Sequence, residues 1–261
     1  MQTNRTLRFV YLLLAAFAGW PNLASAADRP AIAIIIDDIG YRAVQDRAAL
    51  GLPGPLSYAV LAQAPGAVQA RKLAQANGSE IILHLPMESA NHAQRSADDL
   101  VPGVLTSDMS WASFVRTLHR HLAAVPDAIA VNNHEGSRLT ADKERMQWLM
   151  QALAVHGDLA FVDSRTTHRT VALQEARYSG LPAVRRDVFL DPQPGEIAVQ
   201  FQTLIDLAKE KGIALGIAHP YPETVAFLRR HLPGLRQQGV DLIKLSEMIR
   251  LKQKMALQDK R

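Results

Sequence analysis

Short apolar segments alternate with helix-forming segments along most of this chain, and that alternation restricts the folds available to it. Each apolar segment is continuous, as expected for a strand buried on both faces of a parallel sheet. The predicted strands cover residues 31–36, 56–61, 80–85, 128–131, 159–162, 183–185, 213–218 and 240–243. The predicted helices cover residues 41–50, 65–76, 107–124, 140–156, 171–179, 195–211, 222–232 and 246–255.

Seven or eight strands that alternate with helices indicate an α/β fold. A closed (β/α) barrel and a parallel sheet covered on both faces both fit the pattern, and a doubly wound open sheet is the alternative. No Ser- or Gly-rich linker interrupts residues 27–261, so we expect one domain. Ser107 and Thr140 are the expected N-caps of two of the helices, because a hydroxyl can accept a hydrogen bond from the first turn.

The first residues have the features of an export signal. Two arginines, Arg5 and Arg8, precede an apolar run over residues 9–18, and Ala24-Ser25-Ala26 fits a signal-peptidase site. The apolar run is shorter than the roughly 20 residues of a membrane span, although an uncleaved anchor is the alternative. We therefore expect residues 1–26 to be a signal peptide. The mature chain is then periplasmic or secreted, with no stable membrane span.

Composition excludes several classes of site. The 261 residues include no cysteine, so thiolate metal sites, disulfides and cysteine nucleophiles are impossible. Any transition metal must be held by His, Asp or Glu. Loss of Arg5 and Arg8 with the signal peptide lowers the net charge from +4 to +2, which is too small to indicate nucleic-acid binding.

Polar residues gather where the predicted strands end. In both barrels and open α/β sheets, functional side chains lie at the carboxyl ends of the strands. The residues at or just after these ends are Asp37, Asp38, His84, Asn132, Asn133, His134, Asp163, Ser164, Arg165 and His219. Three histidines and several carboxylates at one edge predict a shared metal or acid–base site.

Each of these residues also has an ordinary structural interpretation. Asp37-Asp38 and Asp163-Ser164 could cap helices, His84 could be a hydrogen-bonded residue near the core, and His219-Pro220 could begin a loop. Asn132 to Gly136 could form a turn. The six remaining histidines are expected at the surface: His92, His119, His121, His156, His168 and His231.

Adjacent carboxylates at the end of a buried strand raise each other's pKa unless a positive charge compensates them. A bound cation would neutralise one carboxylate and leave the other free to transfer protons. Two imidazoles and one carboxylate form a common open ligand set for a zinc-type metal, which lowers the pKa of water and polarises a carbonyl.

Several segments in fixed order resemble the divergent polysaccharide deacetylases, which are related to the NodB-type carbohydrate esterases. The resemblance covers nearly all of the chain after the signal peptide. The segments are AIAIIIDDIGY (31–41), ILHLPMES (82–89), VNNHEGSR (131–138), FVDSRT (161–166) and GIAHPYPET (216–224).

The resemblance implies a single-domain, distorted (β/α) barrel of seven to eight parallel strands with a metal-dependent site for amide or ester hydrolysis. It implies that Asp37 is the base and Asp38 a metal ligand. Glu88 replaces the second histidine of the family's H-x-x-x-H pair, so the ligand set implied here is Asp38, His84 and His134. His219 then corresponds to the general acid.

Further roles follow from the same resemblance. Asp163, Arg165 and Asn133 are expected to bind or orient the substrate, and the metal is expected to be divalent, with zinc favoured. The implied substrate is an N-acetylated polysaccharide or a peptidoglycan-type glycan. Two alternatives stay open: an inactive envelope protein that binds a glycan or a partner, and a hydrolase of another amide or ester. The roles of Glu88, Asp187 and Asp191 are left open.

Overall fold

The computed structural model describes residues 29–94 and 101–258, so the predicted signal peptide lies outside the described residues. One sheet of parallel strands forms the centre of the molecule. The strands are β1 (Ala31–Ile39), β2 (Ser57–Leu61), β3 (Glu80–Met87), β4 (Ala128–Glu135), β5 (Ala160–Asp163), β6 (Ala183–Arg185), β7 (Val188–Phe189), β8 (Ile213–Ala218) and β9 (Asp241–Leu242).

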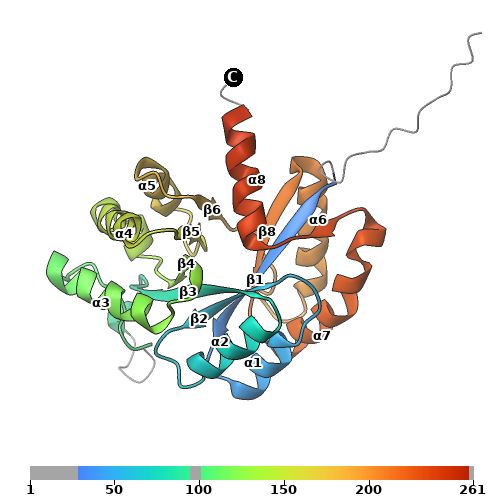
Figure 1. Ribbon diagram of the computed structural model, residues 1–261, viewed down its shortest axis with the longest axis horizontal. Coiled ribbons are helices and arrows are strands. Elements are labelled where there is room, and N and C mark those ends of the chain that lie inside the picture. The colour runs from blue at the N-terminus through green and yellow to red at the C-terminus, as the bar shows by residue number, and fades with distance from the viewer. Residues whose placement is uncertain (1–28, 95–100, 259–261) are drawn as a thin grey trace, which may run out of the picture.

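Helices cover the outer face of the curled sheet, and α8 lies apart from them near its middle (Figure 1). The helices are α1 (Ala43–Leu50), α2 (Ala67–Ala76), α3 (Trp111–Ala124), α4 (Lys143–His156), α5 (Ala172–Tyr178), α6 (Ile197–Lys211), α7 (Pro222–His231) and α8 (Leu245–Gln258). Short 3-10 turns occur at His92–Gln94, Leu139–Ala141 and Leu232–Gln238. In the described part of the chain, no helix is both long enough and apolar enough to span a bilayer.

The strand order shows that the sheet curls into a distorted barrel. It runs β6-β5-β4-β3-β2-β1-β8-β7, with β9 paired to the start of β1. The two edge strands β6 and β7 are separated in sequence by only Arg186 and Asp187. The Cα atoms of Arg185 and Val188 therefore lie at most about 11 Å apart. The backbone N–H of Arg186 donates to Asp163 at 2.9 Å, and that of Asp187 donates to Leu215 at 2.9 Å.

Consecutive residues therefore join β5 to β8, although β6 and β7 form no ladder with each other in the described structure. A doubly wound open sheet would keep its edges apart. The expected single-domain, distorted barrel of parallel strands is confirmed.

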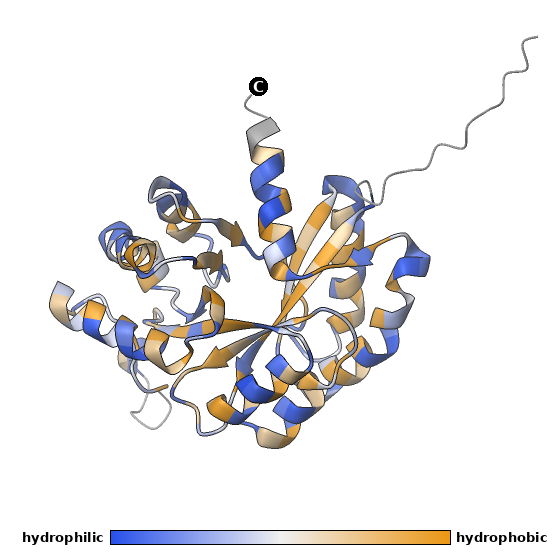
Figure 2. Cartoon of the chain, in the orientation of Figure 1, coloured by the Kyte–Doolittle hydropathy of each residue, from blue (hydrophilic) through white to orange (hydrophobic). Residues whose placement is uncertain are grey.

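Alternate residues of each strand face opposite layers of core. Ile32, Ile34 and Ile36 of β1 pack in the outer layer against the helices, whereas Ala33 and Ile35 face the barrel interior. The interior is filled by alanine and valine together with larger aliphatic side chains such as Ile35, Ile82 and Leu215. Leu245, Met248 and Ile249 of α8 pack in the same interior cluster as the start of β1, so α8 plugs the amino-terminal end of the barrel. Figure 2 shows the resulting pattern of apolar strands and mixed outer helices.

Two predicted helix caps are wrong. Ser110 caps α3 by accepting from the N–H of Ser113 at 3.3 Å, while the N–H of Ser107 donates to the Glu88 carboxylate at 2.7 Å. Asp142 caps α4 by accepting from the N–H of Arg145 at 3.1 Å. The sequence offers several capping residues in each stretch, and tertiary contacts decide where the first turn begins.

The expectation that His121 lies at the surface is also wrong. His121 is buried on the stripe of α3 that includes Phe114 and Leu118. Its Nε2 lies 2.8 Å from the carbonyl oxygen of Gly103. The spacing i, i+4, i+7 of these residues is the signal that could have identified it.

Candidate metal centre and its cavity

The side chains facing the barrel axis change from apolar to polar near the carboxyl ends of the strands. On β1, Ala33 and Ile35 are followed in the same alternation by Asp37; on β4, Ala130 is followed by Asn132 and His134. Strands β1, β3 and β4 extend beyond their predicted ends, so the key residues lie within paired strands and have fixed backbones. The polar layer sits directly on the apolar interior.

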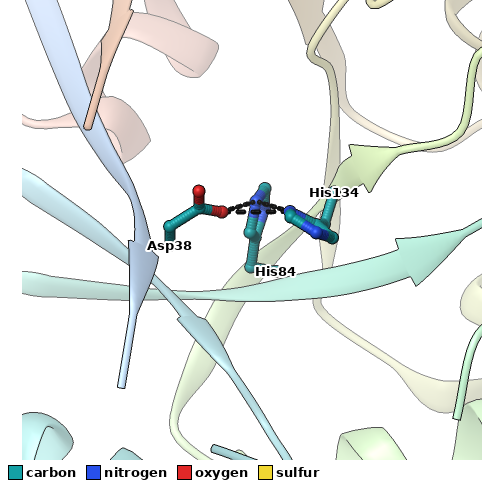
Figure 3. Close-up of side chains that lie close together, drawn as sticks. All are labelled: Asp38, His84 and His134. Atoms are coloured by element: carbon teal, nitrogen blue, oxygen red, sulfur yellow. Dashed lines mark hydrogen bonds and ion pairs between the residues drawn. The ribbon is translucent and has the colours of Figure 1, made fainter. Parts of the chain in front are cut away.

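Asp38, His84 and His134 bring three ligand-type atoms together (Figure 3). His84 Nε2 lies 3.1 Å from Asp38 Oδ1, and His134 Nδ1 lies 3.0 Å from the same oxygen. The two imidazole nitrogens are 3.1 Å apart. Ligands of a tetrahedral zinc ion, each at about 2.0–2.1 Å, lie about 3.3 Å from one another. A small outward movement of these side chains would therefore accommodate such an ion.

A local irregularity turns Asp38 toward the axis. Simple alternation would aim Asp38 at the helix layer, because Asp37 faces inward. The register between β1 and β2 shifts between Ile36 and Ile39, and Asp38 has a left-handed φ of 59°. Aspartate tolerates this conformation better than most residues. Both carboxylates consequently reach the same site.

Asn132 fixes the protonation of His84. The Asn132 amide nitrogen lies 2.9 Å from Asp37 Oδ1 and donates to it, so its oxygen is the group that faces His84 Nδ1 at 2.8 Å. An amide oxygen can only accept, which places the imidazole proton on Nδ1. In the neutral ring, His84 Nε2 then presents a lone pair to Asp38 and His134. Metal-binding histidines typically donate the N–H of their other ring nitrogen to such an acceptor, which fixes the tautomer and the orientation of the ring.

Three electron-pair donors within 3.1 Å of one another favour a shared cation. A proton can join only two of them, whereas a metal ion joins all three. Burial alone would lower the pKa of His84, but the charge of Asp37 and the Asp38 contacts raise it to about 9. Burial would raise the pKa of Asp38, but hydrogen bonds from His134 and His84 hold it well below its usual range. The cluster is electrostatically suited to positive charge, and its donor set fits a divalent metal.

Asp37 lies beside this cluster and is almost fully buried. Its Oδ1 accepts from Asn132, and its Oδ2 is 3.8 Å from His84 Nε2. Burial raises the pKa of Asp37, although the neighbouring His84 and His219 oppose that effect. A carboxylate with a raised pKa that is held near a metal site has the properties of a general base.

His219 faces the cluster from the end of β8. Its Nε2 lies 3.9 Å from Asp38 Oδ2, and its Nδ1 lies 3.0 Å from Asp191 Oδ1. The other Asp191 oxygen accepts from the His219 N–H at 2.7 Å and from the Thr224 hydroxyl at 2.9 Å. Burial tends to lower the pKa of His219, but the Asp191 hydrogen bond and the charge of Asp38 raise it overall. Asp191 therefore supports the charged imidazolium.

These groups open into one cavity of about 430 Å³. Its lining includes all three non-glycine residues with a left-handed φ in the described chain: Asp38, Glu135 and Arg165. Such conformations cost about 1–3 kcal/mol each and cluster at functional sites. A hollow of about 720 Å³ lies at the opposite end of the strands, near Leu159 and Arg250, but none of the clustered ligands line it.

The residues expected to contact substrate occupy different positions. Arg165 lines the cavity. Asn133 also lines it, but its amide oxygen accepts from the Ser164 N–H at 2.8 Å and its nitrogen donates to the Glu135 carbonyl at 2.7 Å. Asp163 lies behind the cavity and accepts from the Arg165 N–H and the Thr170 hydroxyl. Asn133 and Asp163 thus hold the loop that presents Arg165.

The structure also places the residues whose roles the sequence left open. Glu88 stands outside the metal cluster, where it accepts from the Ser107 N–H and pairs with Arg138 at 3.3 Å. Asp187 accepts hydrogen bonds from the Leu215 N–H and from Lys252 of α8. It therefore links α8 to β8. Asp191 alone of the three contacts a residue of the candidate site, through His219.

The sequence assigned no role to Asn132, Arg186, Phe189 or Asp191, although Asn132 stands among the predicted strand-end residues. Asn132 shares the inward alternation of Ala130 and His134, a signal that the sequence does contain. Arg186 and Phe189 lie around the short β7 strand, which was not predicted, and they reach the cavity only because the barrel closes there.

Comparison with known proteins gives a family and a fold. The chain matches the family model described as "Divergent polysaccharide deacetylase" over residues 34–249. It is 36% identical over 236 residues to the uncharacterized protein YibQ of Escherichia coli K12, covering 90% of this chain and 72% of that protein.

Two solved structures are similar in fold. The uncharacterized protein ATU2773 from Agrobacterium tumefaciens C58 superposes with a TM-score of 0.80 at 21% identity, covering 86% of this chain and 91% of that one. Peptidoglycan deacetylase PdaC from Bacillus subtilis superposes with a TM-score of 0.52 at 13% identity, covering 90% and 97% respectively. At these identities, the similarity concerns the fold.

Proposed function

The chain belongs to the divergent polysaccharide deacetylase family, and from that premise we propose that it is a metal-dependent hydrolase that removes acetyl groups from the N-acetylated sugars of an envelope polysaccharide. The observation that carries this proposal is the convergence of Asp38, His84 and His134, beside Asp37 and His219, in one cavity. The fold shared with a peptidoglycan deacetylase supports a glycan of that type.

The proposed chemistry divides the work among five side chains. Asp38, His84 and His134 would hold a divalent ion, which we propose to be zinc. When bound, such an ion lowers the pKa of water and polarises the acetyl carbonyl.

Asp37 and His219 would move the protons. Asp37 Oδ2 accepts a proton from the attacking water as its oxygen bonds to the carbonyl carbon. The bond between that carbon and the sugar nitrogen then breaks, and His219 Nε2 donates its proton to the departing amine. The products are acetate and a free amino sugar. Asp191 accepts a hydrogen bond from His219 Nδ1. This contact stabilises the charged imidazolium, so Nε2 carries the proton that it donates.

Replacement of a ligand tests the proposal. We expect His84→Ala to lose stoichiometric zinc, measured by elemental analysis, and to lose acetate release from N-acetylglucosamine oligomers or peptidoglycan. His168→Ala is the matched control, because His168 is exposed on the loop after β5. If His84→Ala retained both its zinc and the parent rate, its assigned role would be wrong.

An inactive glycan-binding protein on the same barrel is the second candidate. It is favoured by Glu88, which replaces the family's second histidine and is committed to Ser107 and Arg138. Zinc-loaded protein that binds acetylated oligomers but releases no acetate from any of them would support this candidate over the enzyme.

We further propose that the protein acts outside the cytoplasm. The basic residues, apolar run and A-x-A site of residues 1–26 support export. Mass spectrometry of the protein purified from the envelope fraction tests this, because cleavage at the proposed site would place Ala27 at the amino terminus.

A further inference from the structure

Two arginines line the same cavity as the metal cluster, on the side built by β5 and the joint between β6 and β7. Arg165 lies in the loop after β5 and is exposed, whereas Arg186 is partly buried. Burial and the charge of Arg165 both lower the pKa of the Arg186 guanidinium. The charges of Asp37 and Asp163 act in the opposite direction. The two arginines therefore belong to one electrostatically coupled group at the cavity, where a further anion would be favourably placed.

Arg186 is held by neutral groups. Its Nε donates to the Ser164 carbonyl at 2.6 Å, and one terminal nitrogen donates to the Arg165 carbonyl at 2.8 Å. The guanidinium carbon lies 4.8 Å from the centre of the Phe189 ring. Within residues 29–94 and 101–258, it forms no ion pair, so its charge is oriented but not neutralised by direct contact.

Arg165 is held by its backbone. It adopts a φ of 50°, and its N–H is fixed at 2.9 Å by Asp163 Oδ1. The preceding Ser164 N–H is fixed at 2.8 Å by Asn133. A left-handed conformation is unfavourable for arginine and lowers the stability of the fold. Such conformations cluster at functional sites, and this one holds Arg165 at the cavity. Its guanidinium has no hydrogen bond or ion pair with any described residue.

The charge of the whole cavity also favours an anion once the cluster is filled. The carboxylates that line it are Asp37, Asp38 and Glu135, and the arginines are Arg165 and Arg186. A divalent ion on Asp38, His84 and His134 would make the positive charges outnumber the three negative ones. A paired guanidinium site is well matched to a carboxylate, which can accept several charge-assisted hydrogen bonds.

We propose that Arg165 and Arg186 bind a carboxylate of the glycan, so that the preferred substrate carries a carboxylate on the acetylated sugar or on its neighbour. This inference rests on the proposed function and narrows its substrate class. The carboxylate could belong to an ether-linked lactyl group or to a uronic acid, and the two sources present the same chemistry to the arginines.

Binding of three oligosaccharides of equal length tests the inference. One is a neutral N-acetylglucosamine oligomer, one carries lactyl ethers on alternate sugars, and one alternates N-acetylglucosamine with a uronic acid. Affinity is measured by calorimetry on zinc-loaded Asp37→Asn protein, which lacks the proposed base and should not consume the ligand. We expect at least one carboxylated oligomer to bind about tenfold more tightly than the neutral one, with the preference decreasing at high salt.

Variants of the arginines provide the decisive comparison on the same background. Arg165→Gln should bring the carboxylated and neutral affinities close to each other, and Arg186→Lys should weaken the preference while keeping a cation near the Ser164 carbonyl. Arg185→Gln is the matched control, because Arg185 is exposed on β6 and does not line the cavity. Equal binding of neutral and carboxylated oligomers, or an unchanged preference in Arg165→Gln, would overturn the inference.

Acetate release by the unsubstituted enzyme separates this inference from the proposed function. Equal turnover of neutral and carboxylated oligomers, with equal binding, would refute the carboxylate site and leave the deacetylase intact. Selective binding of a carboxylated oligomer with no acetate release from any substrate would refute the deacetylase and leave the carboxylate site intact.

Discussion

Asn132 contacts both a proposed metal ligand, His84, and the proposed base, Asp37. Its amide oxygen accepts from His84, and its amide nitrogen donates to Asp37 and lies 3.3 Å from Ser164 Oγ. One small side chain therefore orients a metal ligand and the proposed base together. Aspartate has nearly the same shape, but it could not donate to Asp37 and would place a third carboxylate in the cluster. The role depends on the amide itself.

Replacement of Asn132 by leucine should weaken metal binding without removing a ligand. His84 Nδ1 would lose its acceptor, so the ring would be free to change tautomer and orientation. Loss of such a partner costs about 10–100-fold in metal affinity. Competition against a zinc chelator measures the change. Asn77→Leu is the control, because Asn77 donates to the Leu50 carbonyl away from the site. An unchanged zinc affinity in Asn132→Leu would contradict this role.

Asp191 should set the pH at which His219 loses its proton. The proposed acid is active when protonated, and the Asp191 carboxylate raises its pKa. In Asp191→Asn, the pKa of His219 should fall, so the decline of kcat/KM at high pH should begin about one pH unit lower.

The control for this profile is Asp187→Asn, which removes a carboxylate that contacts Leu215 and Lys252 outside the cavity. This variant should not change the pH at which kcat/KM begins to decline. If both variants shifted that pH equally, the effect would not come from the pairing of Asp191 with His219.

At the scale of elements, α3 shows how a polar residue can belong to a helix core. His121 lies on the buried stripe, and its Nε2 donates to the Gly103 carbonyl, which leaves Nδ1 buried without a hydrogen-bond partner in the described structure. A side chain added at Gly103 would place its Cβ 2.7 Å from His121 Nε2. The neutral His121 imidazole therefore packs closely against Gly103 and joins α3 to the loop before it.

This contact predicts that folding stability decreases in mild acid. Burial lowers the pKa of His121 in the folded protein, and Arg120 adds to the effect against the Gly103 hydrogen bond. Below about pH 6.5 the unfolded chain binds a proton that the folded chain does not, so the stabilisation present above that pH is progressively lost.

Urea unfolding between pH 8 and pH 5 measures this loss. His121→Gln can still donate to Gly103 but does not titrate, so its free energy of unfolding should vary less with pH. His119→Gln, two residues earlier on the exposed face of α3, should retain the slope of the parent protein. A parent-like slope in His121→Gln would show that other groups cause it.

At the scale of the whole molecule, the site is assembled from strand ends that are distant in sequence. Asp38, His84, His134 and His219 come from β1, β3, β4 and the end of β8, and the barrel is completed only by the Arg186–Asp187 joint. A ligand that bridges these strands should hold the barrel together. Metal binding and global stability are therefore linked.

Zinc should raise the melting temperature of the intact protein. At 100 times its dissociation constant, a ligand specific for the folded state contributes about 2.7 kcal/mol, which corresponds to a shift of about 5–10 °C for a domain of this size. A chelator should reverse the shift, and His84→Ala should not show it. The same increase in His84→Ala would place the stabilising zinc elsewhere on the molecule.

The sequence by itself determined the class of fold, since continuous apolar strands that alternate with helices are typical of a parallel sheet covered on both faces. It also determined which residues stand at the carboxyl ends: the clustering of Asp38, His84 and His134 agrees with the set that the resemblance implied. The alternation along β4 also places Asn132 on the inner face, with Ala130 and His134.

Only the tertiary structure decided how the barrel closes and which residues act from behind the site. Asp191 reaches His219 across a 28-residue separation, and Arg186 enters the cavity because two neighbouring residues join opposite edges of the sheet. It also decided that Asp38 turns inward and that His121 is buried. These features depend on register shifts and on packing between distant segments, which local periodicity does not encode.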